Sequence, residues 1–214
     1  MIKLQIEERS EGLNLLLLGA HCDDIEIGAG GTILRLVNEY KINHIKWVVF
    51  ASTPERAKEA KDCADFFLQG VSSKEIIIRD FRDGFLLQSR FEIKSFFEEI
   101  KSGFSPDLVL THNQYDLHQD HKLLSELSWN TFRNHLILEY EIPKYDGDTG
   151  NPGLFFEIDK ATAERKVFGL MEYYGTQRKK HWFDNETFYA LLRLRGMQSA
   201  CHYAEAFYSR KIVL

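Results

Sequence analysis

Short, uninterrupted hydrophobic runs alternate along this chain with segments in which hydrophobic residues recur every three or four positions. Uninterrupted runs are typical of strands buried on both faces, and the wider spacing is typical of helices with one buried face. The runs predict strands at residues 14–18, 46–51, 75–78, 107–111 and 136–140. Because helical segments separate these runs, the pattern predicts a parallel sheet with helices on both faces.

The rest of the pattern completes the expected order of elements. Helical spacing follows the first strand and recurs at residues 54–70, at 93–103 and up to residue 134, with a loop at 79–88. Later segments are expected to form a surface loop at 144–153, a strand at 154–158, a helix closed by Gly175, a helix that stops at Gly196 and a strand at 203–214. No repeat, low-complexity segment or shift in composition interrupts the chain, so we expect residues 1–214 to form one domain.

Two clusters of histidine and acidic residues follow the first and the fourth predicted strand. They contain His21, Asp23, Asp24 and Glu26 in the first cluster and His112, Asp116, His118, Asp120 and His121 in the second. Parallel α/β folds carry their chemistry at the carboxyl edge of the sheet. Catalytic zinc sites use three ligands drawn from His, Asp and Glu and leave a fourth position for water. The clusters therefore predict a metal site in which one of the two adjacent aspartates binds the metal and the other moves a proton.

Each of these residues also has an ordinary structural explanation. A single Asp or His between a strand and a helix often caps the helix, but five such residues within ten positions are hard to explain as caps. Glycines at 28, 30 and 31 suggest a dinucleotide-binding loop, yet GxGxxG spacing is absent and the preceding acidic residues would repel a pyrophosphate. We interpret these glycines as positions of close packing at a tight turn.

Composition narrows the class of protein. The 214 residues carry a formal net charge of -5, which argues against a nucleic-acid partner. The three cysteines are odd in number and far apart, and no CxxC pair of the structural-zinc type is present. The start of the chain lacks a basic region followed by a hydrophobic one, and no hydrophobic run is long enough to cross a membrane. We therefore expect a cytoplasmic protein without a membrane span.

Together, the two clusters resemble the motifs of a known family. Residues 20–26 read AHCDDIE, similar to the AHPDDE motif of the LmbE-like, or PIG-L, zinc-dependent N-acetylglucosamine deacetylases. Residues 118–121 read HQDH, similar to the HPDH motif of that family, and residues 195–196 and 203–207 resemble an RG…YAEAF stretch near its C-terminus. The resemblance covers almost the whole chain. It implies a Rossmann-like three-layer α/β sandwich with a mostly parallel sheet.

The resemblance also implies roles for individual residues. The zinc ligands of the family correspond to His21, Asp24 and His121. Asp23 resembles the general base, and His118 matches the residue that stabilises the oxyanion or protonates the leaving amine. Asp120 matches the carboxylate that orients a motif histidine. Arg56 and Asp83 resemble positions that contact the sugar.

The function implied by the resemblance is hydrolysis of an N-acetyl group. The substrate would be a small amino-sugar compound, such as an N-acetylglucosamine glycoside or a nucleotide sugar, and the product acetate. One Zn²⁺ per chain is implied, with Fe²⁺ as an alternative, and a homo-oligomer is compatible with this picture. Residues 144–153 and 176–182 are expected to overhang the site.

Three positions depart from the family motifs, and two other functions stay open. Cys22 replaces the motif proline and is either a small buried residue or an additional zinc ligand. Glu26 stands one place later than the family's glutamate and receives no role, and Asp116 stands where some relatives place a tyrosine near the reacting carbonyl. The alternatives are a metal hydrolase for another N-acyl amine or a phosphate ester, and a non-catalytic Rossmann-like module that binds a small molecule.

Overall fold

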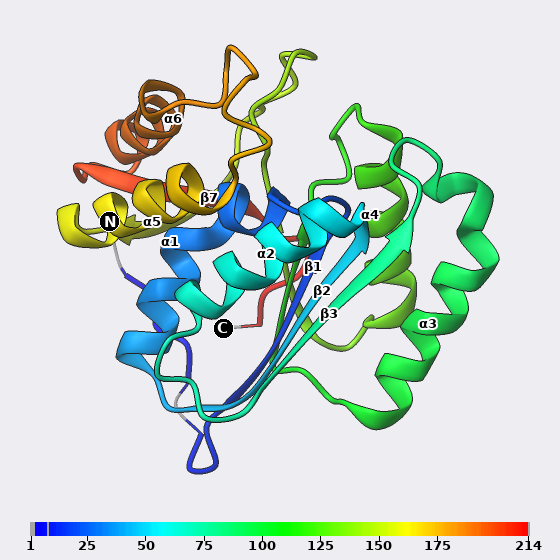
Figure 1. The fold of residues 1–214 in the computed structure, drawn as a ribbon. Helices are drawn as coiled ribbons and strands as arrows, with labels where there is room; N and C mark the ends of the chain where they lie inside the picture. The colour runs from blue at the N-terminus through cyan, green and yellow to red at the C-terminus, as the bar shows by residue number, and fades with distance from the viewer. Residues whose placement is uncertain (1–2, 8, 214) are drawn as a thin grey trace.

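The computed structural model describes residues 3–7 and 9–213, which fold around a seven-stranded sheet (Figure 1). The strands are β1 (Leu13–Gly19), β2 (Ile42–Ala51), β3 (Lys74–Phe81), β4 (Leu108–His112), β5 (Leu136–Tyr140), β6 (Leu154–Ile158) and β7 (Tyr203–Tyr208). The helices are α1 (Asp24–Glu39), α2 (Pro54–Phe67), the 3₁₀ helix η1 (Leu86–Ser89), α3 (Arg90–Gly103), α4 (Gln119–Thr131), α5 (Lys160–Tyr173) and α6 (Asn185–Gln198). The strands lie in the order β3-β2-β1-β4-β5-β7-β6.

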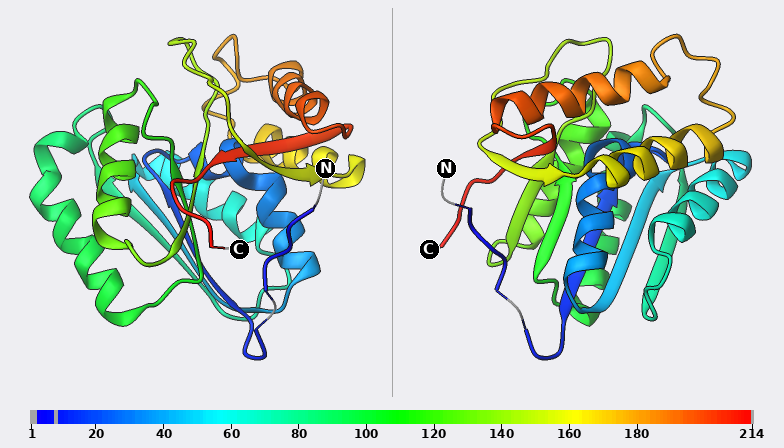
Figure 2. Two further views of the ribbon diagram at one scale, coloured as in Figure 1. Left: turned by 180° about the vertical axis from the view of Figure 1, so that it is seen from behind. Right: turned by 90° about the vertical axis from the view of Figure 1, so that its left-hand side faces the viewer.

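The sheet is the middle one of three layers. Helices α1, α2 and α5 lie on one face, and α3 and α4 lie on the other (Figures 1 and 2). Strands β1 to β5 pair in parallel, whereas β7 pairs antiparallel with both β5 and β6. The three-layer α/β fold with a mostly parallel sheet, expected from the sequence, is confirmed.

Strand β1 explains why the first hydrophobic run has no polar interruption. Leu15 and Leu17 belong to the core beneath α1 and α2, while Leu16 and Leu18 belong to the core beneath α3 and α4. Successive side chains of a strand point to opposite faces of the sheet. All four leucines are fully buried because helices cover both faces.

The strand order reverses between β1 and β4. From β1 the chain builds the sheet outward through β2 and β3, and β4 then pairs with the other side of β1. The carboxyl ends of β1 and β4, at Gly19 and His112, lie at the same edge because the two strands are parallel. Ligands of open α/β sheets bind where the strand order reverses in this way. The two His/Asp clusters follow these two strand ends.

Strand β7, near the C-terminus, reaches back to the middle of α1. The Glu205 carboxylate accepts hydrogen bonds from the backbone N–H groups of Gly31 (2.7 Å) and Thr32 (2.6 Å). Lys166 of α5 pairs with the same carboxylate at 2.6 Å and donates to the carbonyl oxygen of Ile27. Both charged side chains are buried. A Cβ atom at Gly31 would lie 3.1 Å from Glu205 Oε1, so this glycine permits close packing, as expected, but it lies within helix α1 and not at the expected tight turn.

The structure corrects several expected boundaries. Helix α6 continues past Gly196 to Gln198, and β7 ends at Tyr208 rather than near the end of the chain. The expected loop at 79–88 contains the end of β3 and the start of η1, and α4 ends at Thr131. Gly196 is a packing residue rather than a helix stop, because a Cβ there would lie 2.3 Å from the backbone oxygen of His202.

Gly196→Ala is expected to destabilise the fold by about 1–3 kcal/mol, because the added methyl group cannot fit without moving the backbone before β7. Urea denaturation of the variant measures this change. Gly103→Ala is the matched control, since a Cβ at the end of α3 meets no described atom within 4 Å. An equal effect of both substitutions would contradict the packing role of Gly196.

Helix length and hydrophobicity bear on the expected absence of a membrane span. Within residues 3–7 and 9–213, no helix is both long enough and apolar enough to cross a membrane.

Candidate metal centre

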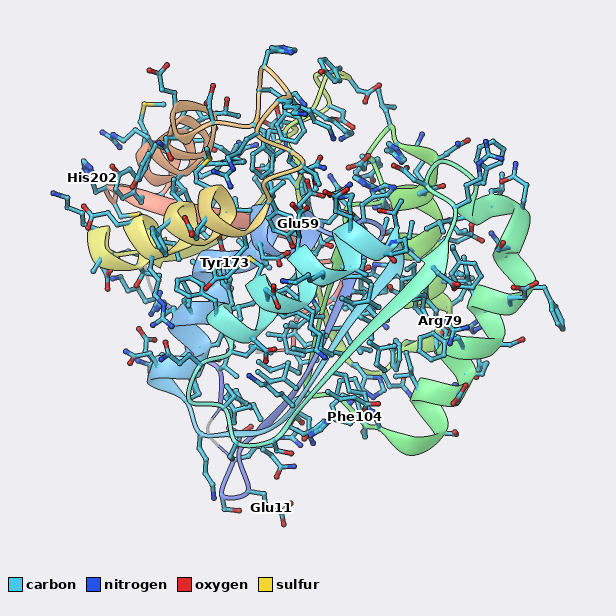
Figure 3. The ribbon with its side chains drawn as sticks, in the orientation of Figure 1. Glu11, Glu59, Arg79, Phe104, Tyr173 and His202 are labelled. Atoms are coloured by element: carbon cyan, nitrogen blue, oxygen red, sulfur yellow. The ribbon has the colours of Figure 1, made fainter. Side chains whose placement is uncertain are left out.

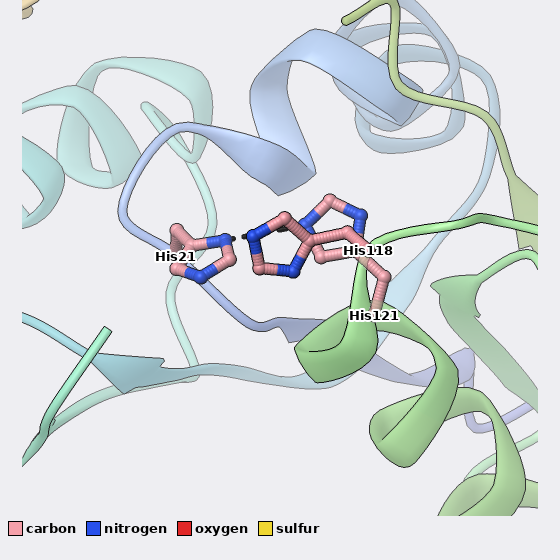
Figure 4. A group of neighbouring side chains, drawn as sticks. All are labelled: His21, His118 and His121. Carbon is pink, nitrogen blue, oxygen red and sulfur yellow. Dashed lines mark hydrogen bonds between the residues drawn. The ribbon is translucent and has the colours of Figure 1, made fainter. Parts of the chain in front are cut away.

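The three residues expected to bind zinc present their ligand atoms to one another. His21 Nδ1 lies 3.2 Å from His121 Nε2 and 3.3 Å from Asp24 Oδ2, and His121 Nε2 lies 3.5 Å from the same oxygen. Figure 4 shows the rings of His21 and His121 facing each other. In a tetrahedral site with zinc–ligand bonds of about 2.0–2.1 Å, neighbouring ligand atoms lie about 3.3 Å apart. These residues therefore fit a tetrahedral divalent metal ion.

The carboxyl edge of the sheet brings these ligand atoms together. His21 lies in the turn after β1, and Asp24 is the first residue of α1 and accepts the His21 backbone N–H at 2.6 Å. His121 lies in the first turn of α4, which follows β4. Since β1 and β4 are adjacent, segments far apart in the sequence meet at the point where the strand order reverses.

Two carboxylates lie against the other ring nitrogen of His21. His21 Nε2 lies 3.3 Å from Asp120 Oδ2 and 3.0 Å from Asp83 Oδ1. Backbone N–H groups of Gly84 (2.8 Å) and Leu86 (3.1 Å) donate to Asp120 and hold its carboxylate in place. Metal-binding histidines usually contact a carboxylate in this way, which fixes the orientation of the ring. Asp83, expected to contact a sugar, is mostly exposed, and its hydrogen bond with His21 lowers its pKa to about 2.

Asp116 supports His121, a contact that motif spacing did not indicate. Asp116 Oδ2 lies 2.8 Å from His121 Nδ1, and its side chain is 3% exposed. Lys144 Nζ lies 2.9 Å from the same carboxylate oxygen. The sequence placed Asp116 in the second His/Asp cluster and showed that it departs from the family motif, but it gave no indication of the contact with His121.

Two further histidines surround the proposed ligands. The ligand nitrogens of His21, His118 and His121 lie within 4.8 Å of one another, and so do the ligand atoms of Asp24, His112 and His121. His112 Nε2 lies 3.1 Å from Asp24 Oδ2 and accepts the backbone N–H of Ala20 at 2.9 Å. Either histidine is thus close enough to take part in binding a metal.

Asp23 pairs with an arginine of α2. Its Oδ1 forms an ion pair with Arg56 Nη2 at 2.9 Å, and both side chains are largely buried. Asp24 contacts the three histidines His21, His112 and His121. The adjacent aspartates therefore face different partners. Arg56, expected to contact a sugar, lies against Asp23.

At His21 and Asp24, neighbouring charges outweigh the effect of burial on the pKa. Burial lowers the pKa of His21, but nearby carboxylates, led by Asp24, raise it well above its ordinary value. Burial raises the pKa of Asp24, yet the surrounding histidines, led by His121, hold it well below the usual range. Burial lowers the pKa of His118 and of His121, which favours the neutral imidazole that binds metals.

Cys22 and Glu26 are buried beside the site. The Cys22 thiol lies against the carbonyl oxygen of Ala51 at 3.6 Å, and burial raises its pKa to about 12. This environment favours a small buried residue over a thiolate ligand. Glu26 accepts a hydrogen bond of 2.6 Å from the hydroxyl of Tyr174, and burial raises its pKa to about 8. Glu26, which received no role from the sequence, is fully buried.

Two loops rise side by side from the edge of the sheet that carries the site. Residues 141–153 and 174–184 extend in the same direction (Figures 1 and 2), and the rings of Tyr145 and His181 lie 5.5 Å apart. Glu59 of α2, labelled in Figure 3, accepts hydrogen bonds from the backbone and hydroxyl of Thr176 at 2.8 and 2.6 Å. The second loop is thereby tied to the helix that carries Arg56.

Fold and site together define an α/β protein with a His/Asp cluster arranged for a metal ion at the reversal of strand order. The chain belongs to the PIG-L family: its family model, described as GlcNAc-PI de-N-acetylase, matches residues 16–132. The resemblance noted in the sequence is thereby confirmed. A comparison with curated proteins gave no match.

Solved structures share the fold at low sequence identity. The conserved protein TT1542 from Thermus thermophilus is 21% identical, with a TM-score of 0.72 over 94% of this chain and 96% of that one. N,N'-diacetylchitobiose deacetylase from Pyrococcus horikoshii is 17% identical, with a TM-score of 0.64 over 92% and 84%. The 4-carboxy-2-hydroxymuconate hydratase from Pseudomonas putida KT2440 is 16% identical, with a TM-score of 0.71 over 94% and 98%. Since a deacetylase and a hydratase share this fold, the reaction has to be argued from the site.

Proposed function

We propose that this protein is a zinc-dependent deacetylase that removes the N-acetyl group of an amino-sugar substrate and releases acetate. The observation that carries the proposal is the set of three ligand atoms of His21, Asp24 and His121, which lie 3.2–3.5 Å apart. Membership of the PIG-L family supports the reaction. An N-acetylglucosamine glycoside or a nucleotide sugar is the proposed substrate, and one Zn²⁺ or Fe²⁺ per chain is the proposed metal.

Asp23 is the proposed general base. Zinc, when bound, supplies a Lewis acid that polarises an acyl carbonyl and makes water more acidic. Asp23 directly precedes the proposed ligand Asp24 at the start of α1, and its carboxylate is proposed to take a proton from the attacking water. Arg56 holds one carboxylate oxygen at 2.9 Å and thereby fixes the direction of the carboxylate.

His118 is the proposed donor to the substrate. Its Nδ1 accepts the backbone N–H of Asp120 at 3.2 Å, at the start of α4. In a neutral imidazole with an accepting Nδ1, the proton lies on Nε2. His118 Nε2–H can therefore donate a hydrogen bond to the developing oxyanion, and the proton that Asp23 takes from the water can pass to the departing amine.

The proposal includes a single domain and a cytoplasmic location. Residues 1–214 would act as one domain, since all described strands join one sheet. Cys22, Cys63 and Cys201 are free thiols, which suits the reducing cytoplasm.

Two measurements test this function: elemental analysis of the purified protein, and acetate release from a panel of N-acetyl sugars and nucleotide sugars. Near one zinc or iron per chain together with acetate release is the expected result. Metal without acetate would favour hydrolysis of another N-acyl amine or of a phosphate ester. Absence of metal after loading at neutral pH would favour a module that only binds a small molecule.

A further inference from the structure

Asp116 connects the candidate metal centre to the loop at residues 141–153, part of which was expected from the sequence to overhang the site. One of its carboxylate oxygens lies 2.8 Å from His121 Nδ1 and 2.9 Å from Lys144 Nζ. The other accepts the backbone N–H of His118 at 2.8 Å. Asp116 thus contacts a proposed ligand, the proposed donor and a lysine from the segment 141–153.

Lys144 is held between two carboxylates. Besides Asp116, its ammonium group contacts Asp148 Oδ2 at 2.6 Å, and its side chain is only 11% exposed. Asp148 also accepts the backbone N–H of Leu117 at 2.6 Å, next to the proposed donor in sequence. The ion-pair cluster Asp116–Lys144–Asp148 therefore joins the loop to the segment between β4 and α4.

The same loop is fixed at a second place. Arg195 of α6 forms two hydrogen bonds with the carboxylate of Glu141, at 2.6 and 2.5 Å, and donates to the carbonyl oxygen of Gly150 at 3.2 Å. Arg195 and Glu141 are both buried. This second anchor does not involve Lys144, so the loop base stays attached when Lys144 is changed.

Removal of the lysine ammonium would leave two shielded carboxylates close together without a cation between them. A buried charge that loses its partner is strongly unfavourable, and like charges repel. The Asp116 carboxylate would then turn away from its present position. The His121 ring would lose the contact that fixes its orientation, and such contacts affect metal affinity.

We propose that Lys144 is a positioning residue of the metal centre: by holding Asp116 against His121, it couples the order of loop 141–153 to metal binding. The inference rests on the metal site of the proposed function but not on its substrate. Coupling is reciprocal. Metal binding should therefore order the loop, and an ordered loop should strengthen metal binding.

Zinc affinity tests this inference directly. Lys144→Met keeps the length of the side chain and removes its charge, and it is expected to weaken Zn²⁺ binding about 10–100-fold in a chelator competition. Asp116→Asn should weaken binding similarly, and the double variant should cost little more than either single change, because both act through one contact. Lys160→Met is the matched control, since Lys160 also pairs with a carboxylate, Glu164, but on the exposed surface of α5.

Limited proteolysis supplies a second readout. Zinc is expected to protect residues 141–153 of the wild-type chain and to protect the Lys144→Met variant much less. If Lys144→Met unfolds in the metal-free state, Lys144→Gln replaces it, with an intermediate loss of affinity expected from a neutral donor. Wild-type zinc affinity in the folded variants would overturn the positioning role. Absence of zinc binding by the wild type would instead overturn the metal site itself.

Discussion

His121→Ala is expected to abolish stoichiometric zinc binding and, with it, acetate release. The substitution removes one of three ligand atoms. Loss of a residue that only supports a ligand weakens metal affinity about 10–100-fold, so loss of the ligand itself should weaken it more. Elemental analysis after dialysis and the acetate assay measure the two effects.

A histidine outside the site provides the control for this experiment. His44 lies in β2 next to Ser73, away from the carboxyl edge of the sheet, so His44→Ala should retain the metal. His112 stacks on His121 at a centroid distance of 3.8 Å and lies close to Asp24. Zinc retained in His121→Ala but lost in His112→Ala would move the ligand role to His112.

Asp23→Asn is expected to keep zinc and to lose turnover by about 10²–10⁴-fold, the range typical of a general acid–base residue. Asparagine has almost the same shape as aspartate but cannot accept the proton of the attacking water. The measurements are kcat for acetate release and the zinc content of the same preparation.

Asp62→Asn serves as a control on the exposed side of α2, where Asp62 pairs with Lys58. Wild-type turnover in Asp23→Asn would show that another group takes the proton. Loss of zinc together with turnover would place Asp23 among the ligands instead of beside them.

Much of the fold could be predicted because each central strand carries its own signal. Residues 15–18 lie in a strand covered on both faces, so all four positions have to be hydrophobic. The antiparallel placement of β7 between β5 and β6 had no such signal. Alternation of hydrophobic and polar residues within one strand does not determine which strands pair with it. Gly196 was misinterpreted because a glycine that ends a helix and a glycine that permits close contact look the same in sequence.

The site was predictable where its residues lie close together along the chain. His21 and Asp24 share one turn and His121 stands in the other motif, so spacing indicated the two clusters and the resemblance singled out these three residues. The contacts of Asp23 with Arg56 and of Asp116 with Lys144 join distant segments, and neither pair forms a local pattern.

The reach of β7 to α1 has a consequence for biosynthesis. Helix α1 begins at Asp24, yet Glu205 satisfies two backbone groups in its middle and neutralises Lys166. A ribosome releases the chain from its N-terminus onward. A nascent chain that already contains both His/Asp motifs therefore lacks the hydrogen bonds of Glu205 to α1 until residue 205 has emerged, and the buried lysine has no counter-charge from Glu205 before then. These contacts of α1 and Lys166 thus wait until residue 205 has been made, although the motifs of the site are made early.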